Sequence, residues 1–92
     1  MPWVLYILLC DQKTYYVGIT SNLPQRLKSH RAKYNPATKR FSDIQLIYTE
    51  QYKTRTEIEI REKQIKDWSI AKKKALVEGK YSQLKRLSKT RS

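Results

Sequence analysis

The sequence contains few of the residues from which disulfides and metal clusters are built. Among its 92 residues there is one cysteine, Cys10, and one histidine, His30. A single cysteine excludes an internal disulfide and fits a reducing compartment. Without a cysteine pair, a second histidine or a DxD or HxE motif, neither a zinc site nor the multi-carboxylate site of a two-metal enzyme is expected. An active site would therefore have to combine tyrosine, arginine, histidine and one or two carboxylates.

Negative charge and long apolar runs are also scarce. The chain has 20 Lys and Arg against 8 Asp and Glu, a net charge of +12, and 39% hydrophobic residues. A core surrounded by positive charge predicts a polyanionic partner, nucleic acid first and an anionic membrane surface second. The apolar start, MPWVLYILLC, lacks a basic beginning and a cleavage site, and it stops at Asp11. We interpret it as a strand of a cytoplasmic protein without a membrane span.

The apolar patterns predict three strands. Residues 3–10 are apolar on both alternating faces, as in a central strand, and residues 15–20 should form an antiparallel hairpin with them. IQLIYTE, residues 44–50, is the third strand. If it pairs with the first strand, it runs parallel to the second. The expected fold is α/β (α+β), a small three-stranded antiparallel or mixed sheet flanked by helices in the order β-β-α-β-α-α.

The first helix is expected to follow Ser21 or Asn22, either of which can cap it. Arg26 borders its inner face. That face should carry residues spaced by four, three and four positions, which are Leu23, Leu27, His30 and Tyr34.

Two more helices are expected after the third strand. Thr56 with Glu59 makes a possible capping box for a helix with a buried stripe of Ile58, Ile65 and Trp68. Ser69 should start the last helix and Gly79 should stop it. We expect a single domain over residues 1–88, ending in a short amphipathic turn, and a basic tail over 89–92.

Three segments resemble a known family in their order and spacing. LYILLCDQKTYYVG, QRLKSH and EIEIREKQIKDW together resemble the GIY-YIG nucleases, especially the small single-domain bacterial members, over roughly residues 2–87. Val4 and Leu5 replace the usual Gly and Ile of the first motif, and Val17 replaces Ile in the second, at positions without a reacting side chain. The resemblance implies a nuclease that cleaves phosphodiester bonds, DNA favoured over RNA, with one divalent cation, Mg²⁺ or Mn²⁺.

Carried over by position, the resemblance assigns catalysis to Tyr6, Tyr16, Arg26, His30 and Glu62, and a structural role to Gly18. Glu62 would hold the cation, and Arg26 would stabilise charge on the phosphate. We choose Tyr6 as the base, with Tyr16 the open alternative, and expect Tyr16 and His30 to hold or relay protons. Helical periodicity alone does not separate Glu62 from Glu57.

Basic side chains supply the expected contacts to nucleic acid. A monomer is expected, and a protein partner for targeting stays open. Binding without cleavage on the same fold is one alternative function, and a basic accessory protein docked on a ribonucleoprotein is another. The residues expected to contact nucleic acid are Arg26, Lys28, Arg31, Lys39, Arg40, Lys72, Lys73 and Lys74.

A shared site for both tyrosines requires a particular hairpin register. A two-residue loop at Gln12 and Lys13 would place Tyr6 opposite Ile19, and the tyrosines would then face opposite sides of the sheet. We therefore predict a loop of odd length, or a bulge, within residues 11–14.

Overall fold

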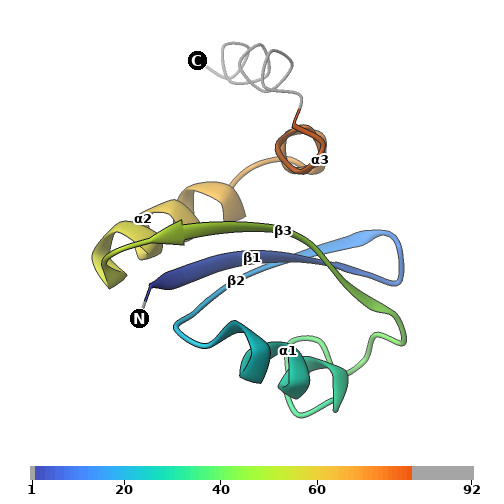
Figure 1. Cartoon of the computed structure of the whole chain (residues 1–92). Coiled ribbons are helices and arrows are strands. Elements are labelled where there is room, and N and C mark those ends of the chain that lie inside the picture. Colours follow the sequence, from blue (N-terminus) through green and yellow to red (C-terminus); the bar gives the residue numbers. More distant parts are fainter. Residues whose placement is uncertain (1, 80–92) are drawn as a thin grey trace.

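The computed structural model describes residues 2–79, and its element order confirms the expected β-β-α-β-α-α arrangement (Figure 1). No helix in this range is long and apolar enough to cross a bilayer. The amphipathic turn and the basic tail expected near the C-terminus lie outside the described residues. The elements are β1 (Trp3–Cys10), β2 (Thr14–Thr20), α1 (Leu23–Arg31), β3 (Ile44–Tyr52), α2 (Arg55–Lys66) and α3 (Ile70–Val77).

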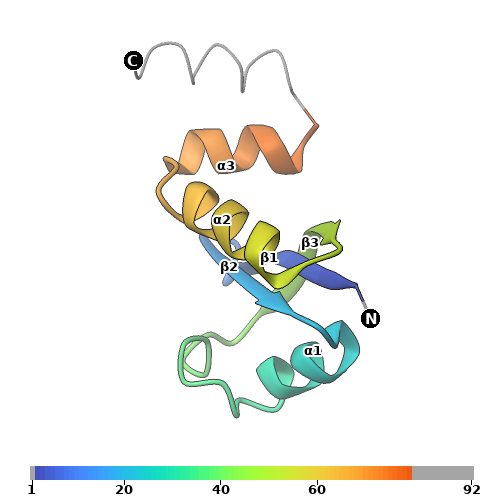
Figure 2. The same cartoon turned by 90° about the vertical axis from the view of Figure 1, so that its left-hand side faces the viewer.

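The sheet has the order β2-β1-β3, and β1 pairs antiparallel with both neighbours. The central position of β1 is as predicted, and helices cover both faces of the sheet. α1 lies on one side, and α2 and α3 lie on the other (Figures 1 and 2). Leu5 and Ile7 pack with the α2 residues Ile58 and Ile65. Tyr6 and neighbouring side chains of β1 instead join the cluster on the α1 side.

The β1–β2 loop consists of Asp11, Gln12 and Lys13, because Cys10 pairs with Thr14. Asp11 and Gln12 have φ values of 51° and 60°, which let so short a loop reverse the chain. The Asp11 backbone N–H donates to the Asp43 carbonyl at 2.7 Å, tying this loop to the start of β3.

This odd loop length confirms the register prediction. Tyr6 lies opposite Gly18, and Leu8 lies opposite Tyr16. Since Tyr6 and Leu8 are two residues apart, they share a face of the sheet, and Tyr16 shares it with them. Both phenols are therefore on the side covered by α1.

The first helix is capped by Asn22, whose side chain accepts the Gln25 N–H at 3.3 Å. Leu23 and Leu27 pack on the sheet, and His30 is fully buried, as predicted. The placement of Tyr34 on this face was wrong. The helix ends at Arg31, and the left-handed residue Lys33 (φ 65°) directs the chain away, so that Tyr34 is exposed.

The predicted start of α2 was two residues late. Thr54, not Thr56, caps the helix and accepts the Glu57 N–H at 3.2 Å, while the Thr54 hydroxyl donates to the Glu57 carboxylate. Both threonines precede a glutamate by three residues, but Thr54 is the one with extended backbone angles.

The predicted ends of α3 are confirmed. Ser69 accepts the Lys72 N–H at 3.2 Å, and Gly79, with φ 73°, follows the C-cap.

Candidate active site

A chain of hydrogen bonds runs through the buried centre of the α1 side. Tyr6 and His30 both have 0% exposure. The Tyr6 hydroxyl lies 3.0 Å from His30 Nε2, and His30 Nδ1 lies 2.6 Å from Thr38 Oγ1. If Nδ1–H donates to Thr38, Nε2 is left to accept the Tyr6 O–H, and we assign this tautomer from the network. Both nitrogens of a neutral imidazole are then satisfied.

Gly18 gives the Tyr6 ring the space it occupies. A Cβ atom on Gly18 would lie 2.5 Å from both Cζ and the hydroxyl oxygen of Tyr6. The glycine of the second motif is therefore required by the close approach of a tyrosine on the paired strand, because Gly18 has no positive φ.

The second tyrosine contacts both buried rings. The Tyr16 ring centroid lies 6.3 Å from that of Tyr6 and 5.3 Å from that of His30, in an edge-on arrangement with the imidazole. Unlike Tyr6, Tyr16 is partly exposed. It therefore forms the outer layer of the aromatic cluster.

Arg26 precedes His30 by one helical turn and lies on the same side of α1. Burial and the neighbouring Tyr16 raise the pKa of Tyr6 to about 12, whereas the Arg26 guanidinium opposes that rise. Burial, and to a lesser extent Arg26, lowers the pKa of His30 below 6.5. The site thus favours a protonated Tyr6 and a neutral His30.

Glu62 lies on α2, which contacts all three strands and covers the side of the sheet opposite α1 (Figure 1). Its side chain is 21% exposed, and its carboxylate lies 3.3 Å from Lys66 Nζ. The charge of Glu62 also contributes to the raised pKa of Tyr6. Two carboxylates on the same helix have other partners, since Glu57 bonds the cap and Glu59 pairs with Arg55. Glu62 also has a partner, Lys66, so the choice of Glu62 over Glu57 stays a prediction.

A single carboxylate is compatible with Mg²⁺ or Mn²⁺. Within residues 2–79, no three His, Cys, Asp or Glu side chains gather into a metal cluster. Mg²⁺ nevertheless needs only one or two carboxylates when waters and substrate phosphates supply its other ligands. Glu62 fits that requirement, because its carboxylate is partly exposed.

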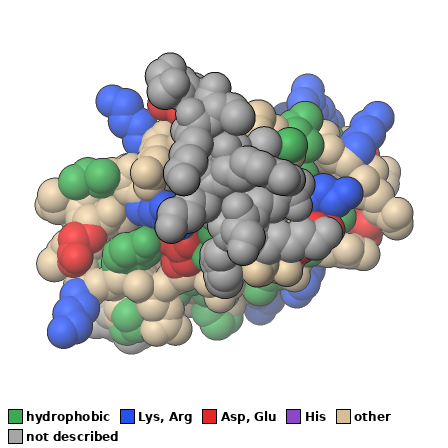
Figure 3. All heavy atoms as spheres, turned by 90° about the horizontal axis from the view of Figure 1, so that it is seen from above, with side chains coloured by type: hydrophobic (Ala, Val, Ile, Leu, Met, Phe, Trp, Pro, Cys, Tyr) green, Lys and Arg blue, Asp and Glu red, His purple; other side chains and the backbone are tan. Residues whose placement is uncertain are grey.

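The predicted nucleic-acid contacts are divided between the two sides of the sheet. Four of the predicted residues are exposed cations on α1 and the loop after it, and α3 carries the lysine run on the opposite side (Figure 1). Figure 3, which views the α3 side, shows basic side chains mixed with acidic and apolar ones. These four predicted residues are Lys28, Arg31, Lys39 and Arg40.

Within the lysine run, only Lys74 is exposed, and Lys73 is half-buried. The structure does not place Lys72 on the surface. Its side chain is 6% exposed, and Nζ lies 4.5 Å from the Trp68 ring centroid, a cation–π distance. Packing on Trp68 is the physical reason for this correction.

Sequence reasoning missed Thr38, which completes the buried hydrogen-bond chain. Thr38 lies in the polar loop between α1 and β3, where no periodicity marks an inward side chain. Its backbone N–H donates to the Asn35 carbonyl at 3.1 Å, and its carbonyl accepts the Phe41 N–H at 3.0 Å. These turns hold the Thr38 hydroxyl against His30.

The fold belongs to a known class. Residues 2–75 match the family profile of the GIY-YIG catalytic domain, and the chain belongs to the GIY-YIG family. It is similar to small UPF0213 proteins of bacteria and archaea. One, from Desulfotalea psychrophila, is 35% identical over 82% of this chain and 70% of its own. Another, from Halobacterium salinarum, is 34% identical over 78% of this chain and 95% of its own.

Two solution NMR structures share the fold. The UPF0213 protein BH0048 of Bacillus halodurans has a TM-score of 0.57 at 29% identity, covering 85% of this chain and 84% of its own. The protein EF2693 of E. faecalis has a TM-score of 0.62 at 27% identity, covering 88% of each chain.

Proposed function

We propose that this protein is an endonuclease that hydrolyses phosphodiester bonds of nucleic acid, DNA favoured, with one divalent cation, Mg²⁺ or Mn²⁺. The observation that carries the proposal is the environment of Tyr6. This side chain bonds His30 and contacts the Tyr16 ring, and Arg26 lies one turn before His30 on the same side of α1. Side chains from β1, β2 and α1 thus gather around one phenol. The match to the GIY-YIG catalytic domain supports a catalytic role for this cluster.

Glu62 and Arg26 divide the electrostatic work in this proposal. Glu62 holds the cation, which when bound would act as a Lewis acid toward the scissile phosphate. Arg26 orients the phosphate and stabilises the negative charge that builds on its oxygens. Arginine suits this task because its planar guanidinium can donate two parallel hydrogen bonds to a phosphate.

The sequence prediction chose Tyr6 as the base that takes a proton from water. The environments of the two tyrosines favour Tyr16 for that role. Tyr6 has no exposed surface and a pKa raised to about 12, so it is poorly placed to take a proton directly from water. Tyr16 is partly exposed and packs on the same imidazole. We assign contact with the attacking water to Tyr16, and we assign to Tyr6 the positioning of His30.

A comparison of binding with chemistry tests this function. Arg26→Ala should lower the single-turnover rate at saturating DNA by about 10²–10³-fold, because a preorganised charge on the phosphoryl group is lost. Lys74→Ala, an exposed cation on the opposite side of the sheet, is the matched control and should leave the saturated rate unchanged. Rates would be measured on a labelled duplex and on supercoiled plasmid in Mg²⁺, Mn²⁺ and EDTA.

The binding-module alternative predicts a different result. If no duplex, branched or single-stranded substrate is cut in either metal while binding is retained, the protein binds nucleic acid without cleaving it. If Arg26→Ala recovers the parent's rate at saturation, Arg26 contributes only to binding.

A further inference from the structure

An exposed aromatic ring is held by a defined backbone motif at the end of α1. The Lys33 N–H donates to the His30 carbonyl at 3.1 Å, and the Tyr34 N–H donates to the Ser29 carbonyl at 3.0 Å. With Lys33 at φ 65°, these bonds form a Schellman motif. The Lys33 ammonium also donates to the Phe41 carbonyl, which supports this left-handed residue. The backbone that carries Tyr34 is therefore fixed.

The side chain of Tyr34 is not used by the core. In a Schellman motif, this position usually carries an apolar residue that packs back onto the helix. Tyr34 is instead 81% exposed, more than the other exposed large hydrophobic residues within residues 2–79, Ile60 and Ile70, at 66% each. A tyrosine has only two side-chain torsions, so a fixed backbone leaves a ring that loses little entropy on binding.

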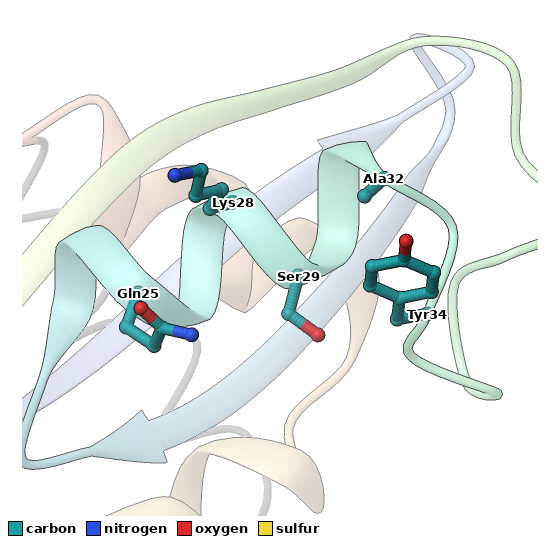
Figure 4. A pocket seen from close by; sticks show the side chains of 5 residues that line it. All are labelled: Gln25, Lys28, Ser29, Ala32 and Tyr34. Atoms are coloured by element: carbon teal, nitrogen blue, oxygen red, sulfur yellow. The ribbon is translucent and has the colours of Figure 1, made fainter.

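Beside this ring lies a groove on the outward side of α1. It has a volume of about 440 Å³, within the range of about 300–1,000 Å³ common for small-ligand sites. Figure 4 shows the α1 side chains along the helix and the Tyr34 ring beyond its C-terminal end. The groove thus combines an aromatic ring, an ammonium and neutral hydrogen-bonding groups. The residues that line it are Gln25, Lys28, Ser29, Ala32 and Tyr34.

The charge around the groove selects an anionic ligand. No Asp or Glu occurs between Asp11 and Asp43, and this acid-free segment includes all of α1 and the loop after it. Lys28, Arg31 and Lys39 are exposed cations of the same segment. Uniform positive charge beside an exposed ring is typical of surfaces that bind single-stranded nucleic acid, where bases stack on aromatic side chains and phosphates meet cations.

We propose that this groove binds an unpaired nucleotide of the substrate, with the base stacked on Tyr34 and its phosphate on Lys28. This inference rests on the proposed function, because it takes nucleic acid to be the substrate, and it makes that substrate a duplex joined to a single-stranded segment. Arg26 and His30 come from the same helix on its site-facing side. A strand held at the active site would reach the groove by passing around α1.

Anisotropy titrations with the full-length protein in EDTA, where metal-dependent cleavage is blocked, test the groove. The probes are a blunt fluorescein-labelled hairpin duplex and the same duplex with a short adenosine extension. Tyr34→Ala should weaken binding to the extended duplex by about 5- to 100-fold, the loss of one stacked base, and leave blunt-duplex binding unchanged. Tyr34→Phe should restore binding, since it keeps the ring.

Two further variants sharpen the result. Lys28→Ala should reduce the slope of log affinity against log salt by about one, as expected for one lost phosphate contact. Ile60→Ala truncates an exposed apolar side chain on α2. It should change neither the affinity for the blunt duplex nor the affinity for the extended duplex.

Equal losses on the two duplexes, or no loss from Tyr34→Ala, would overturn the groove proposal. A second result would also overturn it. If an oligoglutamate peptide binds in a way that depends on Tyr34, and the extended duplex does not, the groove fits an acidic protein segment instead. Cleavage of the same duplexes in Mg²⁺ is scored separately. Ring-dependent binding without cleavage would refute the nuclease proposal and support the groove.

Discussion

At the scale of single residues, Tyr6 owes its position to the missing side chain of Gly18. The two residues face each other across β1 and β2, and the phenol lies where a Cβ atom of residue 18 would be. Because Tyr6 is buried on every side, it cannot move away without losing its hydrogen bond to His30. One glycine therefore holds the centre of the site in place.

Gly18→Ala should destabilise the protein by about 1–3 kcal/mol, as overpacking of a core does, and should abolish most cleavage. Urea unfolding and the cleavage rate of the folded fraction would be measured together. Gly79→Ala is the control, because Gly79 has φ 73° with nothing within 4 Å of the added carbon. It should lower stability by about 1 kcal/mol and leave the rate intact. Full activity in Gly18→Ala would contradict this role of the glycine.

His30 should titrate below 6.5, since burial and Arg26 both lower its pKa. Its contribution to stability is then full above 6.5 and declines as the pH falls toward the folded-state value, because the unfolded chain takes up the proton first. As His30 is the only histidine, its ring signals in an NMR titration need no assignment by mutation. Arg26→Ala should raise the measured pKa. A value at or above 6.5 in the parent would argue against a neutral imidazole at the site.

At the scale of elements, α2 is fixed to the sheet by a polar cluster on the side opposite Tyr6. Glu50 of β3 accepts two hydrogen bonds from Arg61, at 3.0 and 2.9 Å, and two more from the hydroxyls of Tyr48 and Tyr52. The Arg61 guanidinium also lies 5.2 Å from the Trp68 ring centroid. Arg61 immediately precedes Glu62, so this cluster helps to fix the helix that carries Glu62.

Glu50→Gln should lower the free energy of unfolding by about 1–3 kcal/mol at pH 7, because Arg61 loses a charged acceptor. Burial raises the pKa of Glu50, but the hydrogen bonds from Arg61, Tyr48 and Tyr52 outweigh it and leave that pKa below 4.5. This contribution is therefore present above pH 4.5 and is lost as the pH falls through the folded-state pKa.

Urea unfolding at pH 7 and in stronger acid would check this, and the two proteins should converge at low pH. Glu59→Gln, which breaks an exposed ion pair with Arg55, should have no measurable effect on stability. An unchanged gap between parent and Glu50→Gln at all pH values would show that the charge of Glu50 is not responsible.

At the scale of the whole molecule, the fold could be predicted where local pattern determines it. The two apolar faces of residues 3–10 gave a central strand, and the need for Tyr6 and Tyr16 to share a face gave the odd loop. Tertiary contacts decided the rest. The turn at Lys33 is supported by a bond from its ammonium to the Phe41 carbonyl, a tertiary contact that helical periodicity does not indicate.

The dependence on tertiary contacts also explains why the sequence did not predict the roles of Thr38 and Lys72. Thr38 becomes part of it only because the loop after α1 folds against His30. Lys72 resembles its neighbours in sequence, but α3 directs it onto Trp68. Periodicity assigns residues to faces of an element, whereas these contacts depend on how elements and loops dock.

Metal-dependent nicking of supercoiled plasmid by the parent and by Glu62→Gln tests the central claim most directly. The parent should nick in Mg²⁺ and not in EDTA. Glu62→Gln, which keeps the shape of the side chain and removes its charge, should lose the activity by orders of magnitude and still fold and bind DNA. Glu59→Gln, on the same helix, should nick like the parent. Nicking by Glu62→Gln at the parent's rate would contradict the assignment of the cation to this site.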